Sequence, residues 1–79
     1  MVDMIGVNSS NIHSIGYDFI EAELFVRFRN DGARVYKYPG VPKIVWTAFE
    51  QADSKGRFLR EFVIPYFDAE PVDASEMHS

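Results

Sequence analysis

The chain contains no cysteine, so disulfides and thiolate-ligated metal sites are excluded. It also lacks long apolar runs, and no stretch approaches the roughly 20 apolar residues that a membrane-spanning helix needs. Residues 1–20 carry neither the basic start nor the continuous apolar centre of a signal peptide. We therefore expect a soluble, cytoplasmic protein.

Residues with catalytic or metal-binding potential are few. The two histidines, His13 and His78, lie far apart, and no cluster of histidines and carboxylates has the spacing of a metal site. No serine stands in a nucleophile elbow, and Ser54 is better explained as a helix cap. Glu21 and Glu23 would share a strand face, where we interpret them as solvated carboxylates rather than an acid–base pair. The sequence therefore predicts a protein that is not an enzyme and uses no metal or cofactor.

Basic residues are absent from both ends of the chain. All eight lysines and arginines lie between Arg27 and Arg60, where only three acids accompany them. Residues 1–26 and 61–79 hold the other nine acids and no base, so the net charge of −4 conceals a basic middle segment. Such a segment can form an anion-binding patch, or its side chains can simply solvate a sheet face and two helices. Charge alone leaves both alternatives open.

The chain has enough apolar sequence for one small globular domain, with 79 residues that are 47% hydrophobic and 15% aromatic. Period-two alternation predicts a strand over residues 22–29, with further strands over residues 12–18 and 33–38. Asn30-Asp31-Gly32 predicts the hairpin turn between the second strand and the third. Gly16, inside the first strand, indicates a bulge or the close approach of another backbone.

Helical spacing follows the three strands. Pro42 opens a first helix, whose predicted buried stripe is Val41, Val45, Ala48, Phe49 and Ala52, with Trp46 beside it. A second helix has its predicted stripe at Phe58, Leu59, Phe62, Val63 and Tyr66. We expect Ser54 to cap this second helix and Pro65 to end it.

Together these elements predict a two-layer α+β fold, in which a three-stranded antiparallel β-meander is covered on one face by two α-helices. The order of elements is β-β-β-α-α, and the domain is expected over residues 9–67. Residues 1–8 are predicted to form a loose N-terminal arm, and residues 68–79 an acidic, disordered tail. The uncovered face of the sheet would present Phe25 between charged neighbours.

Aromatic and basic residues interleave on the second and third strands, and this pattern indicates a binding site. The candidate nucleic-acid or partner-binding residues are Arg27, Arg29, Arg34, Tyr36, Lys37, Tyr38, Lys55 and Arg57. Sheets with exposed aromatic rings and nearby arginines bind single-stranded nucleic acid through stacking and phosphate contacts. The alternative for Tyr36 and Tyr38 is that they face the helices as core residues. Lys55 and Arg57 open the second helix, where a phosphate site and ordinary solvent exposure are the two alternatives.

The order of motifs resembles the KTSC domain, a small family named for its occurrence at the C-terminus of some lysyl-tRNA synthetases and also found as stand-alone bacterial and phage proteins. The matching motifs are Ser10-x-Ile12-x-x-Ile15-Gly16-Tyr17, Leu24-x-Val26-x-Phe28, Gly32-x-x-Val35-Tyr36-x-Tyr38, Val41-Pro42 and Ala52-x-Ser54-x-Gly56-x-Phe58. The resemblance covers roughly residues 9–66. It implies a non-catalytic domain for which RNA binding has been suggested, with Tyr36, Tyr38, Ser54 and Gly56 as the motif residues here.

Two functions follow as expectations. The first is a small non-enzymatic module that binds nucleic acid, RNA above all, through its basic and aromatic residues. The alternative is a protein-interaction module, for example a phage or mobile-element accessory protein that docks on or inhibits a host protein through its acidic surface or its open sheet edge. In either case we expect a monomer or a weak homo-oligomer that has no contact with a membrane.

Overall fold

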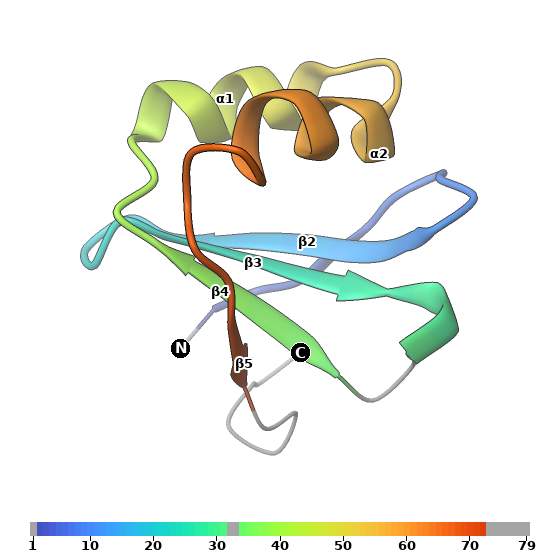
Figure 1. Ribbon diagram of the computed structural model, residues 1–79, viewed down its shortest axis with the longest axis horizontal. Coiled ribbons are helices and arrows are strands. Elements are labelled where there is room, and N and C mark those ends of the chain that lie inside the picture. The colour runs from blue at the N-terminus through green and yellow to red at the C-terminus, as the bar shows by residue number, and fades with distance from the viewer. Residues whose placement is uncertain (1, 32–33, 73–79) are drawn as a thin grey trace.

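The computed structural model describes residues 2–31 and 34–72, and the described chain forms a sheet with helices on one side (Figure 1). The strands are β1 (Ile5–Gly6), β2 (Ile12–Asp18), β3 (Glu23–Phe28), β4 (Val35–Pro39) and β5 (Glu70–Val72). The helical elements are the 3₁₀ turn η1 (Arg29–Asp31), α1 (Lys43–Gln51), α2 (Lys55–Phe58) and the π-helical η2 (Leu59–Val63). Among these residues, no helix combines the length and apolar character that crossing a membrane would require.

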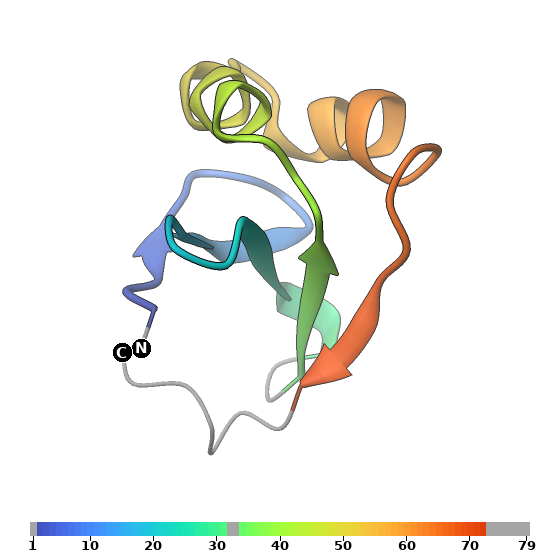
Figure 2. The same cartoon turned by 90° about the vertical axis from the view of Figure 1, so that its left-hand side faces the viewer.

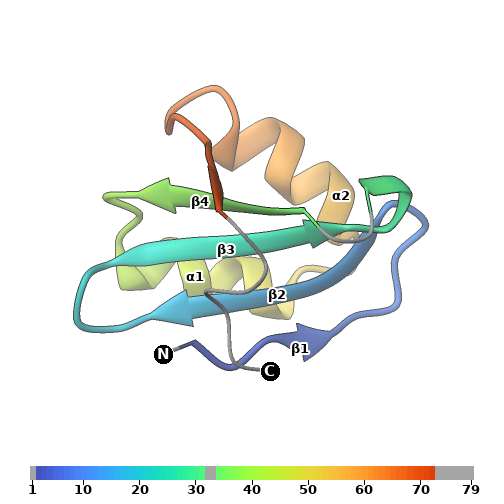
Figure 3. The same cartoon turned by 90° about the horizontal axis from the view of Figure 1, so that it is seen from below.

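The sheet is a five-stranded antiparallel meander in the order β1-β2-β3-β4-β5 (Figure 3). The α+β class and the two covering helices are confirmed, but the prediction of three strands is wrong. The two additional strands come from segments predicted to be loose or disordered. β1 pairs Ile5 with Ile15 of β2, and β5 pairs Val72 with Val35 of β4. Residues 73–79 of the predicted tail, and Gly32 of the predicted hairpin turn, lie outside the described residues.

The main core lies between the sheet and the helices. Its fully buried members include Leu24, Val26, Phe49, Leu59 and Val63. The Tyr17 hydroxyl in this core is satisfied, because it donates a 2.6 Å hydrogen bond to the carbonyl oxygen of Val41. Burial raises the pKa of Tyr17, so this hydroxyl remains a donor at neutral pH.

The Tyr-x-Tyr pair belongs to this same core. Tyr38 is only 4% exposed, and Tyr36 is half-buried with its ring edge-on to Phe28, 5.7 Å between centroids. Both tyrosines oppose apolar residues of β3, since Tyr38 pairs with Leu24 and Tyr36 with Val26. The core alternative for the two tyrosines is therefore confirmed, and they form no exposed stacking platform.

The opposite face of the sheet is covered as well, which the sequence did not predict. The sheet curls so that β1 and β5 bend away from the helices (Figure 2). A second cluster forms there from Val2, Phe25 and Val35, with Met4 and Val72 packed against it. Phe25 is 6% exposed, so the prediction that β3 is half-solvated with Phe25 on an open face is wrong.

The second helix buries a narrower stripe than its sequence predicts. Leu59 and Val63 are buried, whereas Phe62 is 54% and Tyr66 73% exposed. The π-helical hydrogen bond from the Ile64 N–H to the Leu59 carbonyl, 2.9 Å long, widens this turn, and only the Leu59–Val63 line reaches the sheet. The predicted cap is confirmed, because the Ser54 Oγ accepts the Arg57 N–H at 3.3 Å.

Gly16 marks where the N-terminal arm crosses β2. A Cβ built at this position would lie 2.8 Å from the Met4 Sδ, 2.8 Å from the Val2 Cγ1 and 2.9 Å from the Asp3 carbonyl oxygen. The predicted close approach is thus confirmed, while the irregularity of the β2–β3 pairing lies elsewhere, between Ile12 and Ser14.

We predict that Gly16→Ala destabilises the protein by about 1–3 kcal/mol, because the arm must move to accommodate the new methyl group. Gly6→Ala is the matched control, since a Cβ at Gly6 meets nothing within 4 Å. Urea unfolding of the two variants measures the difference. Equal unfolding midpoints would show that the arm does not seal this face.

Candidate functional site

Lys37, predicted as a binding residue on β4, is held between two carboxylates. Its Nζ lies 3.6 Å from Glu23 Oε2 and 3.7 Å from Glu70 Oε1. Glu23 comes from β3 and Glu70 from β5, so both neighbouring strands contribute to the charge of this site. A cation with two carboxylates beside it attracts a phosphate weakly, because the local charge is already negative.

The three predicted arginines Arg27, Arg29 and Arg34 lie in different surroundings. The Arg29 Nε donates to the Ser9 carbonyl oxygen at 2.7 Å and its Nη2 to the Val7 carbonyl oxygen at 3.3 Å, which ties the β1–β2 loop to the end of β3. The Arg27 side chain is partly buried, and its Nε has no hydrogen-bond partner among the described residues. Arg34 is exposed just before β4. These residues do not form one open surface.

A polar cleft lies instead between the β1–β2 loop and the start of α2. It has a volume of about 420 Å³. Its lining residues are Asn8, Ser9, Ser10, Asn11, Asp53, Ser54, Lys55, Gly56, Arg57 and Arg60. Three of these side chains are cationic and one is anionic, and every other member except glycine carries a neutral amide or hydroxyl group. Two predicted residues, Lys55 and Arg57, are therefore brought to this cleft, whereas the other six lie on β3 and β4 or in the segment between them.

The loop side of the cleft is ordered by Ser9 and Asn11. The Ser9 Oγ donates to Asn11 Oδ1 at 3.1 Å and accepts the backbone N–H of Ile12 at 3.2 Å. A Cβ built on Gly56 would lie only 2.6 Å from that same Asn11 oxygen. Glycine at position 56 thus lets α2 approach the Asn11 side chain, and this contact closes the floor of the cleft.

The cations on the helix side of the cleft differ in the hydrogen bonds and ion pairs that they make within the protein. The Arg57 Nε forms a 2.6 Å bond with Glu61 Oε2, and this bond with the carboxylate raises the pKa of Arg57. The Lys55 Nζ donates to the carbonyl oxygen of Ala52. Arg60 is exposed and makes no ion pair within residues 2–31 and 34–72. Arg60 is consequently the cation of the cleft that is most available to a ligand.

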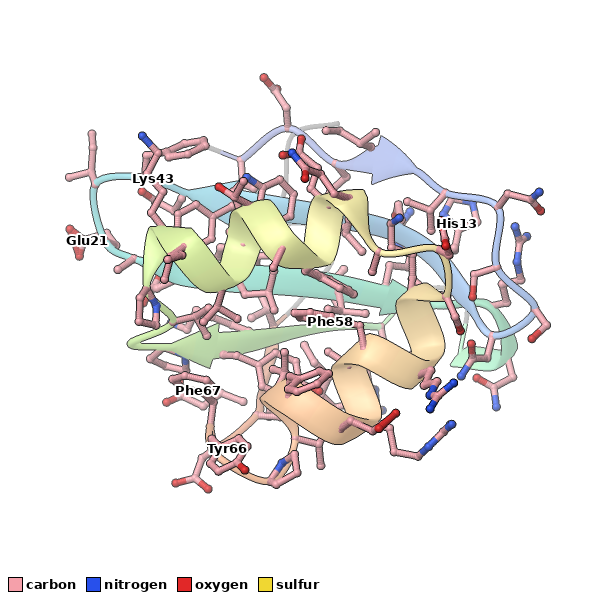
Figure 4. The ribbon with its side chains drawn as sticks, turned by 90° about the horizontal axis from the view of Figure 1, so that it is seen from above. His13, Glu21, Lys43, Phe58, Tyr66 and Phe67 are labelled. Atoms are coloured by element: carbon pink, nitrogen blue, oxygen red, sulfur yellow. The ribbon has the colours of Figure 1, made fainter. Side chains whose placement is uncertain are left out.

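An aromatic groove adjoins the polar cleft and shares Asp53, Ser54 and Arg57 with it. The groove has a volume of about 310 Å³, and Phe58 and Phe62 supply its rings, 5.0 Å between centroids. Phe58 projects from α2 toward α1 (Figure 4), where it stacks on Phe49 at 5.4 Å. Phe62 is left with more than half of its surface exposed. Cationic groups and an accessible ring therefore do lie side by side, on α2 and η2 rather than on the sheet.

Sequence reasoning missed the loop residues of the cleft, together with Arg60 and Phe62. Ser9-Ser10-Asn11 reads only as a loop, and Phe62 falls on the helical stripe expected to be buried. The sequence signal that could have indicated the polar cleft is the glycine at position 56 with cationic residues around it. That signal becomes specific only when the partner of Gly56, the Asn11 side chain 45 positions earlier, is known.

We predict that the effect of Gly56→Ala on the free energy of unfolding changes sign with the residue at position 11. In the natural chain it destabilises by about 1 kcal/mol, because the new Cβ displaces the Asn11 amide from Ser9. In an Asn11→Ala chain the same substitution stabilises by about 0.5–1 kcal/mol, because alanine is the better helix former and nothing opposes it. A double-mutant cycle from chemical denaturation measures this. An identical effect in both backgrounds would contradict the contact.

Comparison with known proteins identifies the family. The KTSC domain matches residues 8–67 of the chain. A protein from Tsukamurella paurometabola is 41% identical over 63 residues, covering 80% of this chain and 91% of that protein. The crystal structure of a KTSC domain protein from Yersinia pestis superposes with a TM-score of 0.84 at 36% identity, covering 91% of this chain and 99% of the other. The chain therefore belongs to the KTSC domain family.

Proposed function

We propose that the chain is a non-enzymatic module that binds single-stranded RNA at the α2 end of the molecule. The polar cleft would hold backbone phosphates, and the exposed ring of Phe62 would stack on a base. The observation that carries this proposal is the junction of the two hollows, which share Asp53, Ser54 and Arg57. A phosphate and its neighbouring base lie close together in a nucleotide, so one strand can occupy both.

The chemistry of the cleft suits a phosphodiester. Phosphate oxygens accept hydrogen bonds from arginine and lysine, and equally from the amide and hydroxyl groups of asparagine and serine. The cleft offers both kinds of donor, and only Asp53 opposes a negative ligand among its lining residues. Asparagine and serine side chains can also contact a ribose 2′-hydroxyl, which distinguishes RNA from DNA.

The non-enzymatic part of the proposal is supported by how the candidate catalytic groups are used. The Ser54 hydroxyl accepts a backbone N–H as a helix cap. Glu23, which forms a paired-carboxylate motif with Glu21 in the sequence, faces the Lys37 ammonium at 3.6 Å. Both groups thus have structural partners.

We predict that Arg60→Gln weakens binding of a short single-stranded RNA by about fivefold, as expected for one solvent-exposed charge contact. The slope of log affinity against log salt concentration should fall by about 0.7, the value for one phosphate contact on a single strand. Fluorescence anisotropy with a labelled RNA measures both quantities. Lys37→Gln is the control, since it removes an equal charge from the sheet. A larger loss of RNA affinity in Lys37→Gln than in Arg60→Gln would show that RNA binds to the sheet and not to the polar cleft.

We predict a different signature for Phe62→Ala, namely a loss of about tenfold in affinity with an unchanged salt slope, because stacking carries no charge. Tyr66→Ala is the matched control, as Tyr66 is an exposed aromatic residue outside the groove. The same anisotropy assay applies, with thermal melts to show that both variants are folded. Equal affinity in the two variants would mean that Phe62 does not stack on the ligand.

A further inference from the structure

A second pocket, separate from the polar cleft, lies at the other end of β2. It is lined by Asp3, Ile5, Tyr17, Asp18, Phe19, Ile20, Trp46 and Glu50, and its volume is about 480 Å³. We call it the aromatic–acidic pocket. It shares no residue with the polar cleft or the aromatic groove. In Figure 4 the turn that carries Glu21 marks this end of the sheet, and His13 marks the opposite end.

Three aromatic rings form one wall of this pocket. Tyr17 and Trp46 are stacked almost parallel, at 9° and 5.5 Å between centroids. Phe19 meets Tyr17 edge-on at 4.9 Å and 83°. Tyr17 and Trp46 are anchored in the core, at 7% and 5% exposure, so Phe19, at 62%, is the ring of this wall that is most accessible to a ligand. The faces of such rings carry negative charge density and attract cations.

Three carboxylates complete the pocket, and none of its lining residues is basic. Asp18 is fixed in place, because its Oδ1 accepts the N–H groups of Ile20 at 2.9 Å and Glu21 at 3.0 Å. These bonds, that of Glu21 first, lower the pKa of Asp18, so its carboxylate is ionised at neutral pH. Asp3 and Glu50 are exposed. The pocket therefore combines an accessible aromatic ring with three carboxylates.

The molecule itself shows that a ring of this pocket accepts a cation. The Lys43 Nζ, on α1, lies 5.7 Å from the centroid of Phe19. Lys43 is not one of the lining residues, so it leaves the volume of the pocket open. Three of the lining residues are exposed apolar side chains that form its rim, namely Ile5, Phe19 and Ile20, at 50%, 62% and 91% exposure.

We propose that the aromatic–acidic pocket binds an arginine side chain presented by a partner protein. A guanidinium group is planar, stacks on aromatic faces and pairs with carboxylates through several N–H groups at once, whereas an ammonium offers only a point charge. The apolar rim favours an arginine carried by a polypeptide over a free small molecule, because flanking residues of the partner would cover Ile5 and Ile20. The acidic pocket and a basic partner are complementary in charge.

Trp46 is the only tryptophan of the chain, so its fluorescence reports directly on this pocket. The experiment titrates the full chain with a capped peptide, Leu-Arg-Leu flanked by glycines, and follows Trp46 emission, with calorimetry as a second readout. The control peptide carries citrulline, which keeps the shape of arginine and removes its charge. We expect saturable binding of the arginine peptide and binding of the citrulline peptide that is at least about tenfold weaker.

Glu50→Gln tests the pocket from the protein side, with Glu61→Gln on η2 as the matched control. We expect Glu50→Gln to weaken binding of the arginine peptide by about fivefold and Glu61→Gln to leave it unchanged. Equal binding of the two peptides, or no binding by either readout up to about 1 mM, would overturn the proposal. If free arginine amide bound as tightly as the arginine peptide, the proposal of a protein partner would be wrong, and the pocket would be a small-molecule site. None of these outcomes depends on RNA binding at α2.

Discussion

The burial of both faces of β3 is the constraint on which the rest of the structure depends. Leu24 and Val26 point to the helices and are fully buried, while Phe25 between them is buried against the N-terminal arm and Val35. A sheet covered on one face would leave Phe25 in water, at a cost of about 2 kcal/mol for a side chain of this size. The two ends of the chain prevent this by adding β1 and β5 at the edges of the curled sheet.

This closure determines where a ligand can be bound. With Phe25 covered and Lys37 placed between two carboxylates, the lower face of the sheet offers neither a ring nor a net positive charge. Two hollows formed by the described residues lie at opposite ends of β2 instead. One is the polar cleft with its cationic side chains, and the other is the aromatic–acidic pocket. Three cationic side chains thus gather in the cleft at one end of β2, and three carboxylates in the pocket at the other.

The sequence predicted what depends on neighbouring residues and missed what depends on distant ones. The bounds of β2, the approximate bounds of β3 and the Ser54 cap depend on local patterns, and all three were predicted closely. Strands β1 and β5 are two and three residues long, too short to show a period. The polar cleft depends on the contact of Gly56 with Asn11, which no local pattern encodes. The family motifs indicated the fold, but they did not predict which surface is accessible to a ligand.

The most direct test of this account is a titration of the ¹⁵N-labelled chain with short single-stranded RNA, followed by backbone amide chemical shifts. The account predicts perturbations in residues 8–11 and 53–62, with no shift at Phe25, Lys37 or the aromatic–acidic pocket. Perturbations centred on β3 and β4, with residues 53–62 unaffected, would contradict it, because they would require the closed face of the sheet to open for the ligand.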